Sequence, residues 1–184
     1  MVTAAADRLA TAEEFYRRPE GSGRFELVKG VIVPMSPTNY DHGMIALKLG
    51  RLIGNFVAEH DLGDTLGAET GFTLRRNPDT VRAPDVAFVS KTRRPTTRLG
   101  FVELAPDLVV EVVSPSDAPD EIQEKVEDYL DAGVQLVGLV YPRAQSVTVY
   151  RSLSEVRVLR APAALTADDL LPGFSLLIAD LFIS

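Results

Sequence analysis

The sequence contains no cysteine and no tryptophan, and its only histidines are His42 and His60. The lack of cysteine excludes disulfides, thiolate zinc sites and a cysteine nucleophile. No apolar run approaches the roughly 20 residues that a membrane-spanning helix needs. Residues 1–15 also lack the basic stretch and apolar core of a signal peptide. We therefore expect a cytoplasmic protein that makes no contact with a membrane.

The length of 184 residues fits one domain, residues 1–184, and 46% hydrophobic residues are typical of a globular protein. The formal net charge of −7 argues mildly against a protein that coats nucleic acid. Basic residues nevertheless concentrate on both sides of residue 85. These residues form either a phosphate-binding surface or an ordinary solvated surface. They are Arg75, Arg76, Arg82, Lys91, Arg93, Arg94 and Arg98.

The order of elements predicts an α/β fold. A capping-box pattern beginning at Thr11 predicts a short helix that ends before Pro19, followed by a loop at residues 20–23. Residues 24–35 read as a hairpin with a turn at Lys29-Gly30. Helical apolar spacing predicts helices over residues 41–59 and 119–132, and a short one that ends at Pro172-Gly173. Strands are expected over residues 67–76, 82–90, 108–113, 134–140, 146–150 and 156–159.

Two carboxylates occur inside apolar, β-branched segments. Asp85 lies in VRAPDVAFVS at residues 81–90, and Glu111 lies in LVVEVVS at residues 108–114. A carboxylate within a buried strand is costly unless something pairs with it. A divalent cation shared by the two strands is the simplest partner. The alternative is that both side chains lie at strand ends and make surface salt bridges.

Lys125 lies on the helix predicted after Glu111. At 100° per residue it falls at the edge of an apolar stripe and beside Tyr129, whereas Glu124 and Asp128 fall on the opposite face, which we expect to be solvated. Lys125 is therefore expected to place its ammonium near the strand ends. A surface pair with Glu121, four residues earlier, is the alternative.

These elements together resemble the PD-(D/E)XK nuclease superfamily, and within it the bacterial Uma-two family of restriction-endonuclease-like proteins. The resemblance covers nearly the whole chain and depends on the order and spacing of several short motifs. They are TAEEFY at residues 11–16, FELVKG at 25–30, MSP at 35–37, His42, APDVAFV at 83–89, LVVEVVSPS at 108–116, KVEDY at 125–129 and Gly133-Val134.

The resemblance implies a mixed central sheet flanked by helices, with an N-terminal helix and a β-hairpin. It also implies a metal site with Asp85 and Glu111 as ligands. Val113 stands where the superfamily pattern has its lysine, and it is counted with these two ligands in the expected metal set. The lysine is inferred to have moved to Lys125. His42 also matches the family, but a polar helix-start or core-edge role is the alternative.

Glu26 matches a glutamate of the family. Phe25 and Leu27 share one face of the predicted hairpin strand, which is expected to be the core, and Glu26 faces the other side. If that side opens onto the cleft, Glu26 is a third acidic group of the site. If it faces solvent, Glu26 pairs with Arg24 or Lys29. Two departures from the family are Lys29, where an aspartate is usual, and residues 135–142, which lack the usual tryptophan and aspartate.

The predicted function is hydrolysis of phosphodiester bonds of nucleic acid, with DNA as the expected substrate and Mg²⁺ or Mn²⁺ as the cofactor, since hard cations suit carboxylate oxygens. Cleavage of both strands would need two sites and therefore suggests a homodimer. One alternative is a catalytically silent module that binds nucleic acid or a protein. Another is a glycosidase that uses Glu26 and Glu111. The absence of tryptophan for a sugar platform makes that alternative weak.

Overall fold

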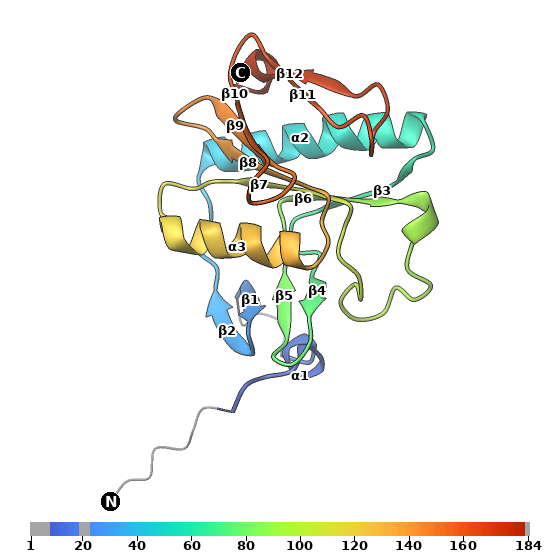
Figure 1. Ribbon diagram of the computed structural model, residues 1–184. Helices are drawn as coiled ribbons and strands as arrows, with labels where there is room; N and C mark the ends of the chain where they lie inside the picture. Colours follow the sequence, from blue (N-terminus) through green and yellow to red (C-terminus); the bar gives the residue numbers. More distant parts are fainter. Residues whose placement is uncertain (1–7, 19–22, 183–184) are drawn as a thin grey trace, which may run out of the picture.

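The computed structural model describes residues 8–18 and 23–182 (Figure 1). The N-terminal part combines helix α1 (Ala12–Tyr16) with a four-stranded sheet in the order β2-β1-β5-β4. Its strands are β1 (Phe25–Val28), β2 (Val31–Pro34), β4 (Phe72–Arg75) and β5 (Thr80–Arg82). The predicted capping box is present, because the Thr11 and Glu14 side chains each bond the other's backbone N–H. The predicted hairpin is confirmed as β1 and β2.

A second sheet of six strands has the order β10-β9-β8-β7-β6-β3. Its strands β7 and β8 are parallel and the other neighbours are antiparallel, so the predicted mixed central sheet is confirmed. The strands are β3 (Gly63–Gly67), β6 (Val86–Ser90), β7 (Leu108–Val112), β8 (Leu136–Tyr141), β9 (Ser146–Tyr150) and β10 (Val156–Leu159). A 3₁₀ turn, η1 (Lys91–Arg93), follows β6.

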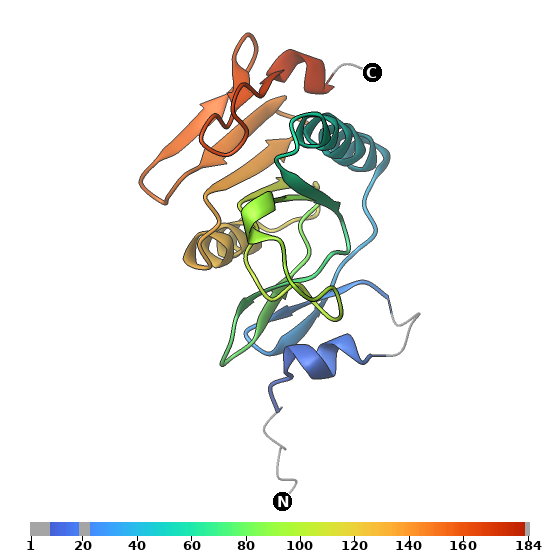
Figure 2. The ribbon, with the colours of Figure 1, turned by 90° about the vertical axis from the view of Figure 1, so that its right-hand side faces the viewer.

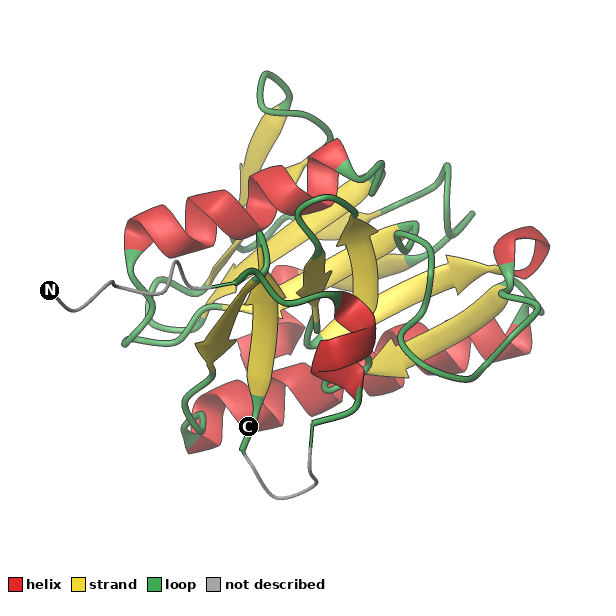
Figure 3. Cartoon of the chain, turned by 90° about the horizontal axis from the view of Figure 1, so that it is seen from below, coloured by secondary structure: helices red, strands yellow, loops and turns green. Residues whose placement is uncertain are grey.

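Two long helices cover the two faces of the six-stranded sheet. Helix α2 (Tyr40–Glu59) lies over one face and α3 (Pro119–Asp131) over the other (Figure 1), and both flank the strands when seen from below (Figure 3). Helix α2 buries Ile45, Leu49 and Ile53 in one apolar cluster, whereas α3 buries Val126 and Tyr129 in another. In each cluster, the helix contributes apolar side chains at helical spacing, and the strands contribute every second side chain. Burial of this apolar surface stabilises the packing of the helix on the sheet.

The chain ends with a two-stranded sheet, β11 (Ala164–Thr166) and β12 (Ser175–Leu177), and helix α4 (Ile178–Phe182). These elements lie beside α2 at one end of the molecule, with the four-stranded sheet at the other end (Figure 2). No helix within the described residues has the length and apolar character that crossing a membrane requires. The predicted loop at residues 20–23 lies almost entirely outside the described residues.

Two predicted strands are in fact divided between the two sheets. Residues 67–76 do not form one strand, because the chain leaves β3 through a turn at Glu69, whose φ is 74°, and enters β4. Gly71 is required in this crossing, since a Cβ there would lie 2.4 Å from the Phe101 ring. Residues 82–90 likewise divide into the end of β5 and β6. Pro84, which has no N–H for a ladder, lies in the break. Asp85 therefore lies in a bend before β6, not within a strand.

The C-terminal prediction was also wrong. Residues 168–173 form turns instead of a short helix that ends at Pro172-Gly173. The helix occurs later, as α4, where Ile178 and Leu181 are buried against the core around α2. Tertiary burial of these two side chains, three residues apart, outweighs the local helical pattern that precedes Pro172.

Candidate active site

Asp85 and Glu111 meet where β6 begins and β7 ends. The antiparallel register pairs Val86 with Val110, so Asp85 comes just before the paired part of β6 and Glu111 just after that of β7. The backbone N–H of Val112 donates to Oδ2 of Asp85 at 2.8 Å, which holds the bend against the end of β7. The two carboxylates lie close enough for the charge of Asp85 to contribute to the raised pKa of Glu111.

Glu111 is almost completely buried, with 8% of its surface exposed. Its Oε1 accepts a 2.7 Å hydrogen bond from the Tyr129 hydroxyl and lies 3.6 Å from Nζ of Lys125. Burial raises the pKa of Glu111 to about 7, and the charges of Asp85 and Glu26 also raise it, while Lys125 and the Tyr129 hydrogen bond act in the opposite direction. The removal of Glu111 from water is thus the main reason why its proton is held more tightly than usual.

Lys125 does not pair with Glu121. Its Nζ lies 3.6 Å from Glu111 Oε1 and 3.6 Å from Glu26 Oε1, and its side chain is 24% exposed. Burial lowers the pKa of Lys125, but the charges of Glu111 and Glu26 outweigh that effect and leave the pKa raised. Lys125 thus occupies the expected seam between α3 and the sheet as an ammonium between two carboxylates.

Glu26 comes to the site from the four-stranded sheet. It is 4% exposed and pairs with neither Arg24 nor Lys29. Its Oε1 accepts the backbone N–H of Ala83 at 3.1 Å, and its Oε2 accepts from Arg82 at 2.9 Å. Glu26 is therefore buried beside Lys125 instead of facing solvent.

His42, in the first turn of α2, completes the cluster. Its Nε2 lies 3.1 Å from Oδ2 of Asp85, and it is 8% exposed. Burial lowers the pKa of His42, but the hydrogen bond and charge of Asp85 outweigh it and leave the pKa raised.

Two groups next to the site were not found by sequence reasoning. They are Tyr129, which the sequence presents as one member of an apolar stripe, and Asp128.

Asp128 corrects a prediction. It does not lie on a solvated face but is 6% exposed, because Arg82 donates to its Oδ2 from Nε at 3.0 Å and from the NH2 nitrogen at 2.6 Å. The helical angle places Asp128 away from the apolar stripe of α3. The four-stranded sheet covers that side of the helix, and no local pattern reveals it.

The basic residues around Asp85 are mostly engaged with carboxylates instead of forming an open phosphate-binding surface. Arg82 is buried. The other ion pairs are Arg75–Asp131, Arg76 with Glu13, Asp79 and Glu103, Lys91–Asp61, Arg93–Asp107 and Arg94–Asp64. Arg98 is exposed in the loop after η1.

The carboxylate pair fits a hard cation. Within the described residues, the hydrogen bonds and ion pairs of Asp85 go to Oδ2 and those of Glu111 to Oε1, which leaves one oxygen of each for an ion. Val113, just past β7, could add only its backbone carbonyl. No group of three or more histidine and acidic side chains in the described part of the chain is arranged to hold a metal. Two carboxylates with water and phosphate oxygens suit Mg²⁺, which rarely uses an all-protein cage.

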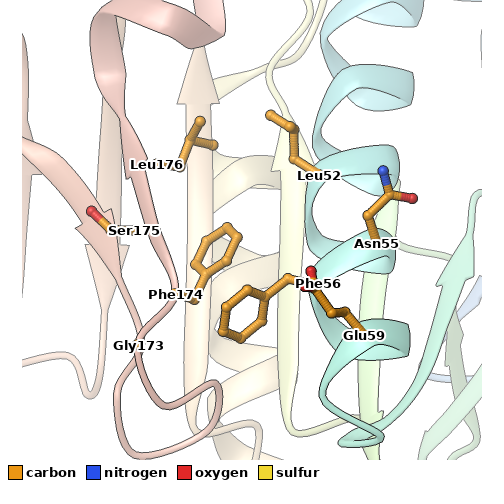
Figure 4. Close-up of a pocket in the computed structure, with 8 residues that line it drawn as sticks. All are labelled: Leu52, Asn55, Phe56, Glu59, Gly173, Phe174, Ser175 and Leu176. Carbon is orange, nitrogen blue, oxygen red and sulfur yellow. The ribbon is translucent and has the colours of Figure 1, made fainter.

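A shallow groove elsewhere on the molecule is separate from this cluster. It lies between α2 and β12, where the rings of Phe56 and Phe174 meet edge to face with centroids 5.3 Å apart (Figure 4). None of the predicted site residues lines this groove.

Comparison with known proteins assigns the class. The crystal structure of a "putative nuclease belonging to DUF820" from Anabaena variabilis superimposes with a TM-score of 0.81 at 25% sequence identity, covering 94% of this chain and 97% of that one. The fold is therefore that of a nuclease-like protein. The model of the Uma2 family, described as "Putative restriction endonuclease", matches residues 12–179. The chain belongs to the Uma2 family, as its motifs indicated. No curated protein matches the chain.

Proposed function

We propose that this protein is a metal-dependent nuclease that hydrolyses phosphodiester bonds of DNA. The observation that carries the proposal is the convergence of Asp85, Glu111 and Lys125 at the junction of β6, β7 and α3. Family membership and the nuclease neighbour agree with this class of reaction. In the proposal, Asp85 and Glu111 hold Mg²⁺ or Mn²⁺, and Val113 completes the set through its carbonyl.

When bound, the cation would polarise a phosphate oxygen and lower the pKa of a water molecule. The residues of the chain supply the rest. The Lys125 ammonium orients the attacking water and neutralises charge that develops on the phosphorane. Glu26 holds Lys125 in place and adds a third carboxylate. The Tyr129 hydroxyl fixes the rotamer of Glu111, and Val112 and His42 fix Asp85, so that the site is preorganised before substrate arrives.

The test is a cleavage assay on plasmid and single-stranded DNA with Mg²⁺, Mn²⁺, Ca²⁺ or EDTA. We expect cleavage with Mg²⁺ or Mn²⁺ that is lost in EDTA and in Asp85→Asn, which keeps the size of the side chain and removes its charge. The matched control is Asp64→Asn, which alters a surface carboxylate paired with Arg94. If wild-type protein leaves every substrate intact under all these conditions, the proposal is wrong.

The second candidate is a catalytically silent module that binds a protein, and it is favoured by the pairing of nearby basic residues with carboxylates. Neither binding of DNA in Ca²⁺ nor cleavage with Mg²⁺ or Mn²⁺ is expected of such a module. In the nuclease proposal, two chains act together on a duplex. Sedimentation of the protein with and without duplex DNA in Ca²⁺ tests that homodimer.

A further inference from the structure

Arg82 is a buried cation that the proposed chemistry does not use. It ends β5, three residues before Asp85, and is 4% exposed. One guanidinium nitrogen donates to Glu26 on β1, and two others donate to Asp128 on α3. A buried charge of this kind is costly unless every partner is in place. Arg82 thus joins β5, β1 and α3 next to the carboxylate cluster.

One of the two carboxylates that Arg82 binds, Glu26, also lies beside Lys125. Arg82 donates a 2.9 Å hydrogen bond to Oε2 of Glu26, whereas Nζ of Lys125 lies 3.6 Å from Oε1 of the same carboxylate. Asp128 follows Lys125 by three residues, which is about one helical turn. A separation of 3.6 Å is longer than a direct hydrogen bond. Lys125 is therefore shared between Glu26 and Glu111 and bonded directly to neither.

We infer that Arg82 is a positioning residue for Lys125. Arg82 neutralises Glu26 by binding its Oε2 and also holds Asp128. It thereby keeps the Lys125 ammonium between the two glutamates, where this ammonium can interact with the reacting phosphate. Without Arg82, Lys125 is the remaining cation beside Glu26, and Coulomb attraction draws it onto that carboxylate and away from Glu111. The proposal rests on the proposed nuclease function and assigns a further residue to it.

The test compares Arg82→Met and Arg82→Lys with Arg76→Met. Arg76 is a matched control, because it also binds several carboxylates, namely Glu13, Asp79 and Glu103, but lies at the β4–β5 turn beside α1 (Figure 1). Rates are measured with saturating Mn²⁺ well below each variant's melting temperature. Mn²⁺ affinity is measured by calorimetry.

We expect Arg82→Met to lower the maximal rate by about 10- to 100-fold with Mn²⁺ affinity changed by less than about threefold, since misplacing a catalytic group by an ångström can cost about 10²-fold. Arg82→Lys should recover only part of the rate, because one ammonium cannot replace a guanidinium fork that binds two carboxylates. Arg76→Met should lower the melting temperature and leave the rate within about twofold. Equal rates for all three variants and wild type would overturn the inference.

A second measurement does not depend on cleavage. The chain has four lysines, Lys29, Lys48, Lys91 and Lys125, so the ammonium signals in a nitrogen–proton spectrum can be assigned with single Lys→Arg variants. Arg82→Met should shift the Lys125 signal and leave that of Lys91 unchanged. An unshifted Lys125 signal overturns the inference. If Arg82→Met does not fold, Arg82→Lys is measured in its place. If wild-type protein does not cleave DNA, the proposed function fails while this spectrum still decides whether Arg82 positions Lys125.

Discussion

Glu111 illustrates how a single side chain is tuned by its surroundings. It lies in an apolar strand, beside a tyrosine hydroxyl and a lysine, and near two other carboxylates. With a pKa of about 7, Glu111 carries a proton in about half of the metal-free protein at neutral pH, at the position where a cation would bind. Metal binding and protonation therefore compete for the same group.

The first prediction concerns the pH dependence of metal binding. Mn²⁺ affinity should fall by about tenfold per pH unit below pH 7, because the ion must displace the proton of Glu111. Calorimetric titrations from pH 5.5 to pH 8, chosen as about 1.5 units below and one above that pKa, measure the slope. In Glu111→Gln, Mn²⁺ binding should be lost. An affinity that is constant across this range would show that Glu111 is not a ligand.

The same pKa predicts a change in stability. Glu111 binds its proton more tightly in the folded state than its unfolded pKa of about 4.5 allows. The native state therefore holds more protons between these values, and the contribution of Glu111 to stability is lost as pH rises from about 4.5 to about 7. Without metal, wild-type protein should lose at most about 3 kcal/mol relative to Glu111→Gln over this range. Urea unfolding of both proteins at several pH values checks the direction.

Lys125→Ala should reduce cleavage by about 10²-fold or more while Mn²⁺ still binds, since an ammonium stabilises the reacting phosphate but is not a ligand. Lys29→Ala is the matched control. It removes another lysine that pairs with a glutamate, Glu124, at a more exposed position. Cleavage by Lys125→Ala at the wild-type rate would remove Lys125 from the proposed mechanism.

At the scale of elements, Asp79 joins α1 to the four-stranded sheet. Its carboxylate accepts from the backbone of Ala12 at 2.8 Å, from the backbone of Asn77 at 3.2 Å and from Arg76 at 2.8 Å. Burial raises the pKa of Asp79, but these hydrogen bonds outweigh it and leave the pKa lowered. The carboxylate thus stabilises the protein above its unfolded pKa, and this contribution is lost as pH falls through the lower, folded pKa.

Asp79→Ala should therefore lower the free energy of unfolding by about 1–3 kcal/mol at neutral pH. The difference from wild type should shrink under acidic conditions. Cleavage well below the melting temperature should be unchanged, because the β4–β5 turn lies beside α1 and away from α2 (Figure 1). Denaturant unfolding at neutral and acidic pH measures the effect. An equal loss at both pH values would show that the charge of Asp79 is not what stabilises this junction.

At the scale of the whole molecule, the net charge of −7 and the paired arginines limit how many phosphates the protein can neutralise. Affinity for DNA in Ca²⁺ should therefore depend weakly on salt. We expect the slope of log affinity against log salt to be no steeper than about −3, since each neutralised phosphate contributes about −0.9. Fluorescence anisotropy with a labelled duplex measures it. A slope near −8 would mean that the ion pairs open to bind phosphates.

The helix cap, the hairpin turn and the apolar faces of the helices were predictable, because residues close in sequence determine them. The Thr11 capping box, the Lys29-Gly30 turn and the apolar stripes of α2 and α3 each depend on neighbours within a few residues. Asp85, Glu111 and Lys125 could be singled out for the same reason, since a charge beside a buried segment stands out in the sequence. That they act together in catalysis stays a prediction.

Only the tertiary structure decided where the chain changes sheets and what each buried charge pairs with. The crossings at residues 68–71 and 83–85 divide segments that the sequence presents as single strands, with Gly71 packed against the Phe101 ring and Pro84 in the break before β6. Asp128 appears solvent-facing on a helical wheel and is buried by Arg82, a residue 46 positions earlier. Sequence patterns report which face of an element is apolar, whereas partners brought together from distant segments are set by how the two sheets and α3 pack.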